Sequence, residues 1–472
     1  MGDFRVEKDT MGEVKVPAAA LWAAQTQRAV ENFPISGLRF DRPFLRALGL
    51  IKWAAAEANL ELKYLDPKVA EAIMQAAKEV ADGEWDAEFP LDIYQTGSGT
   101  STNMNANEVI GARANILLGG KLGEKGKVHA NDHVNFGQSS NDVIPAAIHV
   151  AALTSLENEL LPALKTLQKA LEAKAKEFDP LVKTGRTHLQ DATPIRLGQE
   201  FSGYASQVEH GMRRIEGLRR HLSELAIGGT AVGTGLNAHP KLAAMICERL
   251  TKATGIKFVE AENHFEAQAA QDALVEASGA LKTVAVSMIK ISNDLRILSM
   301  GPRAGLQEIT LPALQPGSSI MPGKVNPDIL EMVNQVCAQV IGNDVAITVG
   351  GITPGLDLAT MMPVMYHNLS QSIHLMTNAS HVWVEKCISG ITANVEHLKR
   401  QSELSTAIVT RLNPVIGYEK AAEIAKESFK TGKTIKELVV EKGYLTKKKA
   451  EELLDPYSMT VQSEKYVASG GG

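Results

Sequence analysis

Residues 153–171 read LTSLENELLPALKTLQKAL, and this stretch indicates the fold class. Its leucines recur at steps of three and four residues: Leu153, Leu156, Leu160, Leu164, Leu167 and Leu171. That period places them on one face of an α-helix, and the pattern extends from about Asp142 to Phe178. A helix of this length with one apolar face is typical of an elongated helix bundle.

Four further segments have the same texture, and we expect a long helix in each. They run from Thr193-Pro194 to about His221, from about Ala267 to Met300, from Asn326-Pro327 to near Gly342, and from about Pro363 to Lys386. The first opens as a helix cap followed by a first-turn proline. Alternating strand-like runs are scarce, and aromatic residues are only 5% of the chain. The sequence therefore predicts a mostly α protein.

The 472 residues suffice for two to four domains with a large core. We expect three domains: residues 1–138 with mixed short segments, 139–394 with the long helices, and 395–472 with short helices. Gly417, Gly432 and Gly443 punctuate the last region. The long helices remain too apolar to form the surface of a monomer. We therefore expect subunits to associate through them.

Composition excludes several classes of protein. A net charge of −5 gives no support for a basic face, so no nucleic-acid partner is expected. No stretch is long and apolar enough to span a bilayer, and the first residues lack the apolar core of a signal peptide. Three scattered cysteines (Cys247, Cys337 and Cys387) argue against a disulfide framework and fit a reducing compartment. We expect a cytoplasmic protein without a membrane partner.

Four segments interrupt the helical texture with Gly, Ser, Thr, Asn and His, at residues 96–100, 129–142, 185–188 and 317–327. The last reads Gly-Ser-Ser-Ile-Met-Pro-Gly-Lys-Val-Asn-Pro. It fails as a phosphate-binding P-loop, because five residues separate its two glycines and Val325 replaces the magnesium-binding hydroxyl. It still fits an anion site, because Asn326 can cap a helix that starts at Pro327 and Lys324 adds a positive charge.

Two weaker patterns have simpler interpretations. His129 and His133 have the i, i+4 spacing of a metal pair, but no third strong ligand is near, so a polar loop that contacts an anion is preferred. Gly233 and Gly235 mimic a dinucleotide-binding fingerprint, but no strand precedes them and a tight turn is the better interpretation. We therefore expect neither a metal ion nor an organic cofactor.

His188 lies in a polar turn before a helix, beside Arg186 and Thr187. It could simply cap that helix, but a histidine there is also suited to proton transfer near neutral pH. Glu331, one turn into the helix after the Lys324 loop, is by itself a favourable charge near a helix N-terminus. Paired with a histidine from another segment, it would orient the ring and stabilise its charged form.

Together the four segments resemble the aspartase/fumarase superfamily, and most closely the class II fumarate hydratases. The resemblance extends from Val16-Pro17 to Gly417-Tyr418, and its hallmark is the Gly-Ser-Ser-x-Met-Pro-x-Lys-x-Asn loop at residues 317–326. It implies the three-domain fold of that superfamily, with a long central helix bundle. It also implies a homotetramer whose active sites are each built from three subunits, with fumarate or L-malate as the small dicarboxylate substrate.

The resemblance implies a role for each matching residue. Ser318 is the expected base that removes a proton from carbon 3 of malate, and His188 with Glu331 handles the water or hydroxyl at carbon 2. The residues expected to hold the two carboxylates are Ser98, Thr100, Ser139, Ser140, Asn141, Thr187, Ser319, Lys324, Val325 and Asn326. His129, Asn131 and Asp132 match a second dicarboxylate site. At Gly126, where the family often has a basic residue, this sequence departs from it, although Lys125 and Lys127 are adjacent.

The expected chemistry explains these residue types. Removing a proton beside a carboxylate produces an aci-carboxylate, which adds negative charge to a substrate that is already a dianion. Preorganised donors must stabilise that charge where it develops, and Lys324, Asn326 and helix N-termini can supply them. Serine is a poor base in water, so Ser318 requires the loop amides and Lys324 to lower its pKa.

Within the superfamily the competing activity is aspartate ammonia-lyase. Residues 96–100, 138–142 and 227–230 favour fumarate hydratase, whereas residues 293–313 and 331–336 are more similar to aspartases. We expect fumarate hydratase, because the segments that favour it belong to the pocket and the others belong to supporting helices.

A structural protein without activity, like the lens proteins of the superfamily, is a further alternative. It is disfavoured because a scaffold does not require Ser318, Lys324, Asn326, His188 and Glu331 together. A nucleotide-binding protein is disfavoured by the failed P-loop and by the misplaced glycine fingerprint.

Overall fold

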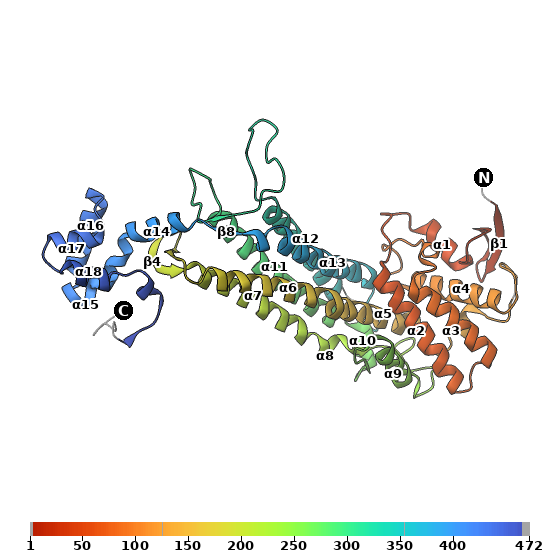
Figure 1. The fold of residues 1–472 in the computed structure, drawn as a ribbon. Coiled ribbons are helices and arrows are strands. Elements are labelled where there is room, and N and C mark those ends of the chain that lie inside the picture. The colour runs from red at the N-terminus through yellow and green to blue at the C-terminus, as the bar shows by residue number, and fades with distance from the viewer. Residues whose placement is uncertain (1–2, 125, 354, 465–472) are drawn as a thin grey trace. The chain divides into compact units, whose positions relative to one another are not determined.

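The computed structural model describes residues 3–124, 126–353 and 355–464, and these are mostly helical (Figure 1). The chain forms two compact units. The first comprises Met1–Pro162, Gly211–Ala285 and Val336–Thr377, and the second comprises Ala163–His210, Val286–Gln335 and Asn378–Gly472. The prediction of a mostly α fold is confirmed, and the division into three sequence regions stays a prediction.

The first unit opens with an antiparallel hairpin of β1 (Phe4–Asp9) and β2 (Gly12–Pro17). Its helices are α1 (Ala24–Asn32), α2 (Arg42–Glu61), α3 (Pro67–Asp82), α4 (Thr100–Leu117), α5 (Ser140–Ser155), α8 (Arg219–Leu222), α9 (Leu242–Thr254) and α10 (His264–Ala269). The short strands β5 (Glu224–Leu225) and β6 (Val259–Glu260) pair in parallel. Helix α2 packs against α3, α5 and α9, which places it at the centre of this unit.

Helix α2 forms the core of this unit because its apolar residues recur with the helical period. Phe44, Leu48, Ile51, Ala55 and Ala58 are fully buried, at steps of four and three residues. The Asp41 side chain accepts a hydrogen bond from the amide of Phe44 at 3.3 Å and so caps the helix. This core fixes the helix that carries a buried lysine described below.

The leucine-rich stretch is helical from Ser140 to Glu177. Helix α5 continues into a π-helical turn, η3 (Leu156–Leu160), and then into α6 (Leu161–Glu177). All six leucines of the predicted face are buried, which confirms the predicted face.

The second unit contains the hairpin of β3 (Val182–Thr187) and β4 (Gln190–Arg196) and the short pair β7 (Ile309–Thr310) and β8 (Thr392–Ala393). The long helices α7 (Leu197–Gly217), α11 (Asp272–Leu298), α12 (Asp328–Ile352) and α13 (Met362–Lys386) have residues in both units. Its C-terminal part contains α14 (Val395–Leu404), α15 (Asn413–Ile416), α16 (Tyr418–Thr431), α17 (Ile435–Glu441) and α18 (Lys447–Leu453).

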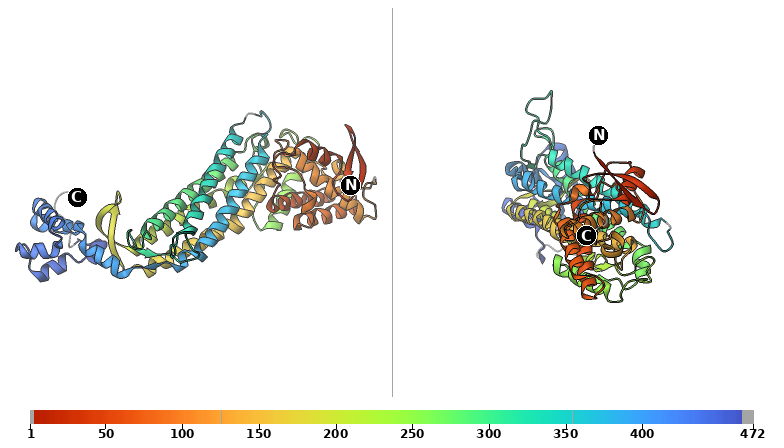
Figure 2. Two further views of the ribbon diagram at one scale, coloured as in Figure 1. Left: turned by 90° about the horizontal axis from the view of Figure 1, so that it is seen from above. Right: turned by 90° about the vertical axis from the view of Figure 1, so that its right-hand side faces the viewer.

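The helices near the C-terminus lie close together (Figure 2). They have a small hydrophobic core of their own. Leu412, Ile424, Leu438 and Leu454 are among its buried side chains. Gly417 and Gly432 end α15 and α16, as the sequence predicts for this region of short helices.

Three predicted helix ends are wrong. Thr193-Pro194 belongs to β4, where Pro194 pairs with Thr184, and α7 starts only at Leu197. This strand pairs with β3 across the turn at His188 and Leu189, and that turn lacks the Asn-Gly pattern that would have indicated a hairpin. The helix predicted from Ala267 is divided into α10 and α11, and α12 extends to Ile352, well past Gly342.

Cys247, Cys337 and Cys387 are free thiols, and each is buried. Burial raises the pKa of each to about 12. Among the described residues, no helix has the length and apolar character needed to cross a membrane.

Candidate active site

A chain of three hydroxyl groups joins two of the predicted segments in the first unit. Thr100 Oγ1 is 2.8 Å from Ser98 Oγ and 2.8 Å from Ser140 Oγ. Thr100 is the first residue of α4 and Ser140 is the first residue of α5. The contact therefore brings two helix N-termini together, where unpaired amides and the helix dipoles favour an anion such as a carboxylate.

Ser139 and Asp142 form a capping box at the start of α5. Ser139 Oγ accepts from the Asn141 amide at 3.2 Å, and Asp142 Oδ1 accepts from the Ser139 amide at 2.9 Å. Asp142 Oδ2 also accepts from the amides of Gly228 and Thr230, at 2.9 and 3.0 Å. Burial raises the pKa of Asp142 to about 6, while these hydrogen bonds act in the opposite direction. One carboxylate thus joins α5 to the loop after β5.

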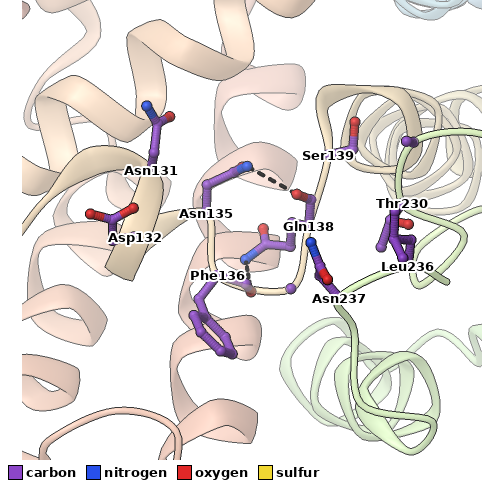
Figure 3. Close-up of a pocket in the computed structure, with 11 residues that line it drawn as sticks. Asn131, Asp132, Asn135, Phe136, Gln138, Ser139, Thr230, Leu236 and Asn237 are labelled. Atoms are coloured by element: carbon purple, nitrogen blue, oxygen red, sulfur yellow. Dashed lines mark hydrogen bonds between the residues drawn. The ribbon is translucent and has the colours of Figure 1, made fainter.

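A pocket of about 700 Å³ lies beside this cap (Figure 3). Its lining residues are Asn131, Asp132, Asn135, Phe136, Gly137, Gln138, Ser139, Thr230, Ala231, Leu236 and Asn237. The pocket brings Ser139 and residues 131–132 together, as the sequence predicts for residues 129–142. The segment around Gly233 forms turns, as expected, but sequence reasoning did not place its neighbours Leu236 and Asn237 in the pocket wall.

In the second unit, Thr187 and His188 lie at the exposed tip of the β3–β4 hairpin. His188 and Leu189 form the two-residue turn and have positive φ angles of 56° and 60°. Type I′ hairpin turns use two such residues, normally Asn and Gly, because a Cβ disfavours this region. A histidine kept in this conformation is typical of a functional site. The alternative in which His188 caps a helix is wrong, because α7 begins after the whole of β4.

The loop from Gly317 to Pro327 is closed by two hydrogen bonds between its ends. The Gly317 amide donates to Lys324 O at 2.7 Å, and Asn326 Nδ2 donates to Gly317 O at 2.8 Å. Helix α12 begins at Asp328, so the Asn326 side chain closes this loop instead of capping a helix that starts at Pro327. The loop therefore has a defined shape even though Ser319, Lys324 and Val325 are exposed.

The Ser318 side chain is held within this loop by two backbone amides. Its Oγ accepts hydrogen bonds from the amides of Ile320 at 3.2 Å and Met321 at 3.0 Å. Donors of this kind favour the charged form of an oxygen. The role of Ser318 as a base stays a prediction.

Comparison with known proteins agrees with these features. Residues 12–342 match the lyase family, and residues 408–461 match the family described as fumarase C C-terminus. The chain is 57% identical to the class II fumarate hydratase of Halobacterium salinarum over 458 residues, or 97% of each chain. The chain belongs to the class II fumarate hydratase family.

Two further relatives extend this similarity. The class II fumarate hydratase of Nitrosomonas europaea is 52% identical over 460 residues, which cover 98% of this chain and all of that one. The crystal structure of the class II fumarase from Schistosoma mansoni superposes with a TM-score of 0.95 at 38% identity, and covers 97% of this chain and 99% of that chain. The fold is therefore that of a class II fumarase.

The predicted pairing between His188 and Glu331 is not found among the residues that the structure describes. In the part of the second unit that the structure describes, His188 and Glu331 make no hydrogen bond or ion pair with each other. The same holds between His188 and the loop residues Ser318 and Lys324. The His188–Glu331 pairing stays a prediction.

The residues that match the family's second dicarboxylate site are grouped at the start of a π-helical turn, η2 (Ala130–Val134). The ring of His129 accepts from the Asp132 amide at 3.2 Å, and the ring of His133 accepts from the His129 amide at 2.8 Å. Asn131 and Asp132 are exposed beside them. Among the described residues, no three His, Cys, Asp or Glu side chains form a group that could hold a metal ion.

Gly126 departs from the family pattern for a local steric reason. A Cβ at this position would lie 2.0 Å from Asn115 Oδ1. Asn115 is fixed there by hydrogen bonds of 2.8 Å to both the amide and the carbonyl of Val128. A basic side chain therefore does not fit at residue 126 in this loop. Lys127 is exposed, and Lys125 lies outside the described residues.

Lys52 is a buried cation that contacts two residues of the pocket wall, and the sequence reasoning missed it. It lies on α2, is fully buried, and donates from Nζ to Asn135 Oδ1 at 2.9 Å and to Gln138 Oε1 at 3.1 Å. Both acceptors line the pocket just before Ser139. Burial lowers the pKa of Lys52 to about 7, and the negative charge of Asp142 acts in the opposite direction. The only sequence signal is a lysine within the apolar run 48–56.

Lys52→Met should change how stability depends on pH. Between pH 7 and the unfolded pKa of about 10.4, the unfolded chain binds one proton more than the folded chain at this residue. The wild type should therefore gain stability relative to Lys52→Met as pH rises from 7 to 9, by up to about 1 kcal/mol per pH unit. Melting temperatures of both proteins at pH 7, 8 and 9 measure this difference. A gap that stays constant would contradict the burial argument.

Proposed function

We propose that this protein catalyses the reversible hydration of fumarate to L-malate, as a hydro-lyase of the class II type. The observation that carries the proposal is the pair of amides that donate to Ser318 Oγ within a closed loop. Membership of the class II fumarate hydratase family and the match of the fold support the same activity. The relatives reported above are fumarate hydratases, and this favours hydration over the deamination of L-aspartate.

In the proposed reaction, Ser318 removes a proton from carbon 3 of malate and the electrons move into the adjacent carboxylate. We propose that the positive charge of Lys324 and the side-chain amide of Asn326 stabilise the resulting aci-carboxylate. The bond between carbon 2 and its hydroxyl then breaks, and His188, oriented by Glu331, supplies the proton that converts hydroxide into water. Side chains and backbone amides alone carry out these steps.

We propose that the residues at the helix N-termini hold the substrate carboxylates. Thr100 and Ser140 present adjacent hydroxyls at the starts of α4 and α5, and Ser139 and Asn141 lie at the same helix start. Thr187, Ser319 and Val325 are proposed to complete the binding surface, together with Ser98. The second dicarboxylate site at His129, Asn131 and Asp132 is proposed as a weaker site, because Gly126 supplies no cation there.

We propose that the enzyme is a homotetramer in which three subunits build each active site. In the first unit, α12 exposes Val345, Val349 and Ile352, at 61%, 47% and 74%. Steps of four and three residues place them on one helix face, and such an exposed apolar stripe fits a subunit interface.

We also propose a cellular setting and a domain division for this protein. The activity fits the tricarboxylic acid cycle, and the buried free thiols fit the reducing cytoplasm. We also retain the three domains at residues 1–138, 139–394 and 395–472, with the long helices in the middle one.

The activity is tested by incubating the purified protein with L-malate and, separately, with L-aspartate, and following the ultraviolet absorbance of fumarate. We expect turnover of malate alone. Turnover of aspartate alone would assign an ammonia-lyase. Turnover of neither substrate would favour the alternative of a structural protein without activity.

Shared active sites are tested by mixing two inactive variants. Tetramers that contain both His188→Asn and Ser318→Ala subunits should recover part of the activity, because some sites then draw each residue from an intact subunit. Unmixed variants treated in the same way are the controls, and a mass measurement under native conditions gives the subunit number. No recovery in verified mixed tetramers would contradict sites shared in this way.

A further inference from the structure

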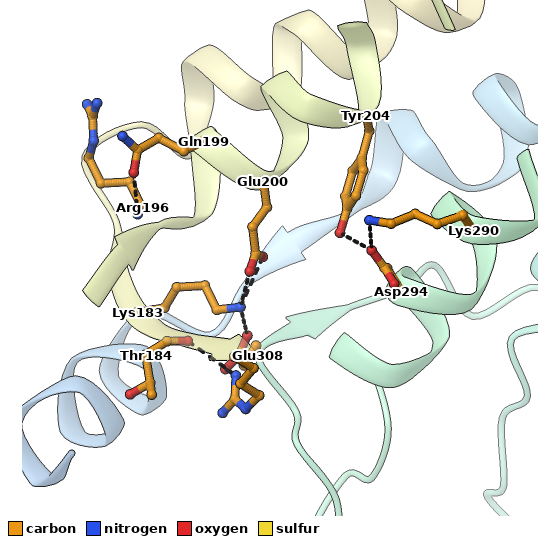
Figure 4. A network of polar contacts seen from close by, with 10 residues as sticks. Lys183, Thr184, Arg196, Gln199, Glu200, Tyr204, Lys290, Asp294 and Glu308 are labelled. Carbon is orange, nitrogen blue, oxygen red and sulfur yellow. Dashed lines mark hydrogen bonds and ion pairs between the residues drawn. The ribbon is translucent and has the colours of Figure 1, made fainter. Parts of the chain in front are cut away.

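A buried ion network involves the hairpin that carries His188 (Figure 4). Lys183 Nζ is 2.7 Å from Glu200 Oε1 and 2.6 Å from Glu308 Oε2. Arg186 Nη1 is 2.5 Å from Glu308 Oε1. The Glu308 side chain is fully buried and that of Lys183 is 2% exposed. Two cations thus face two anions, and Glu308 is the carboxylate that contacts both cations.

The hairpin that carries both cations contains a β-bulge beside them. Residues three apart on a regular strand, such as Lys183 and Arg186, point to opposite faces. The register between β3 and β4 shifts between Thr184 and Arg186, where Ala192 and Thr193 of β4 together oppose Gly185 of β3. A Cβ on Gly185 would lie 2.5 Å from Thr193 O, so this bulge requires a glycine. Lys183 and Arg186 nevertheless both contact the Glu308 carboxylate.

The backbone of Glu308 is fixed on the other side of the network. Its amide donates to Leu298 O at 2.8 Å, and its carbonyl accepts from the Asn394 amide at 3.0 Å. Strand β7 follows at once and pairs with β8. The chain then continues from β7 into the loop that starts at Gly317. Glu308 therefore stands where the segment that leads to Ser318 leaves the folded core.

We infer that Glu308 is a positioning residue that ties the His188 hairpin to the segment bearing the Ser318 loop, and so sets the rate of the reaction without touching the substrate. The inference rests on the proposed function. Its physical basis is that a buried charge without a partner is costly, so the carboxylate holds Arg186 and Lys183 in one arrangement. Arg186 is two residues before His188, at the base of the strained turn. A displacement of about 1 Å at a catalytic group can lower a rate by about 10²-fold.

The first test compares two variants with the same change of charge. Glu308→Gln should lower kcat for malate by about 10- to 100-fold and change KM by less than about threefold. Glu200→Gln removes the other carboxylate from Lys183 but leaves the Arg186–Glu308 pair in place. It should keep kcat within about threefold of the wild type at a comparable loss of melting temperature. Equal kcat for all three proteins, or equal loss in both variants, would overturn the inference.

A second variant separates positioning from misfolding. Glu308→Met combined with Arg186→Met removes one charge of each sign and leaves the Lys183–Glu200 pair intact. Replacing a buried ion pair by apolar side chains of similar volume is often neutral for folding. This folded protein should show the same loss of kcat as Glu308→Gln. Wild-type kcat in the double variant would overturn the role of Glu308.

Hydrogen exchange gives a readout that does not depend on the substrate. Amides of residues 186–191 should exchange at least about tenfold faster in Glu308→Gln than in Glu200→Gln, because only the first variant releases Arg186. Unchanged exchange at the hairpin would count against the inference whatever the activity. Failure of the wild type to convert malate would instead count against the proposed function alone.

Discussion

Ser318→Ala should lower turnover of L-malate by about 10²- to 10⁴-fold, the range expected when a catalytic acid or base is removed. The Ser318 Oγ is the proposed proton acceptor, and the amides of Ile320 and Met321 donate to it at 3.2 and 3.0 Å. Alanine removes the acceptor but leaves the two hydrogen bonds that close the loop, since neither involves this side chain. The substrate should therefore still bind.

Steady-state rates and calorimetric binding of fumarate measure the two parts of this prediction. Ser319→Ala is the matched control, because Ser319 is proposed to bind a carboxylate and its loss should raise KM more than it lowers kcat. Turnover close to that of the wild type in Ser318→Ala would exclude Ser318 as the base. Loss of binding together with turnover would show that the loop itself had collapsed.

His188→Asn should lower kcat by a similar factor of about 10²–10⁴ while the hairpin keeps its shape. His188 has a φ of +56°, and Asn accepts this left-handed conformation more readily than Ala does. Asparagine has no nitrogen that titrates near neutral pH, so proton transfer at carbon 2 should be lost. The substitution thus separates the chemistry of the ring from the conformation of the turn.

The neighbouring position provides the control. Leu189 has a φ of +60° and is 72% exposed, so Leu189→Asn makes a comparable change in the same turn and keeps the imidazole. It should retain most of the activity, and circular dichroism should show both variants folded. A loss of rate as large in Leu189→Asn as in His188→Asn would assign the effect to the turn and not to the histidine.

The long helices could be predicted because their information is local. The leucines from Leu153 to Leu171 all face the core, and the segment from Pro363 to Lys386 matches α13 to within one residue. Thr193-Pro194 misled the prediction because strand β4 depends on its pairing with residues near Thr184. A local pattern indicates a helix face, but the hairpin was missed because its turn, His188-Leu189, is not one of the sequences that favour such a turn.

Some residues of the candidate site could likewise be predicted from the sequence, and others could not. The segments with Ser318, His188 and Ser139 were evident from their polar residues, and the Thr100–Ser140 contact agrees with them. Lys52 and Glu308 could not be found, because each acts through contacts with residues far along the chain. A single charged residue in an apolar run is the only local sign of such a group.

The three buried thiols have a practical consequence. With a pKa of about 12, about one thiol in 10⁵ is ionised at pH 7, so an alkylating reagent finds almost no thiolate in the native fold. Labelling at Cys247 and Cys337 would then report opening of the first unit, and labelling at Cys387 would report opening of the second. The rates of labelling at the three thiols can thus show whether the two units open together or one after the other.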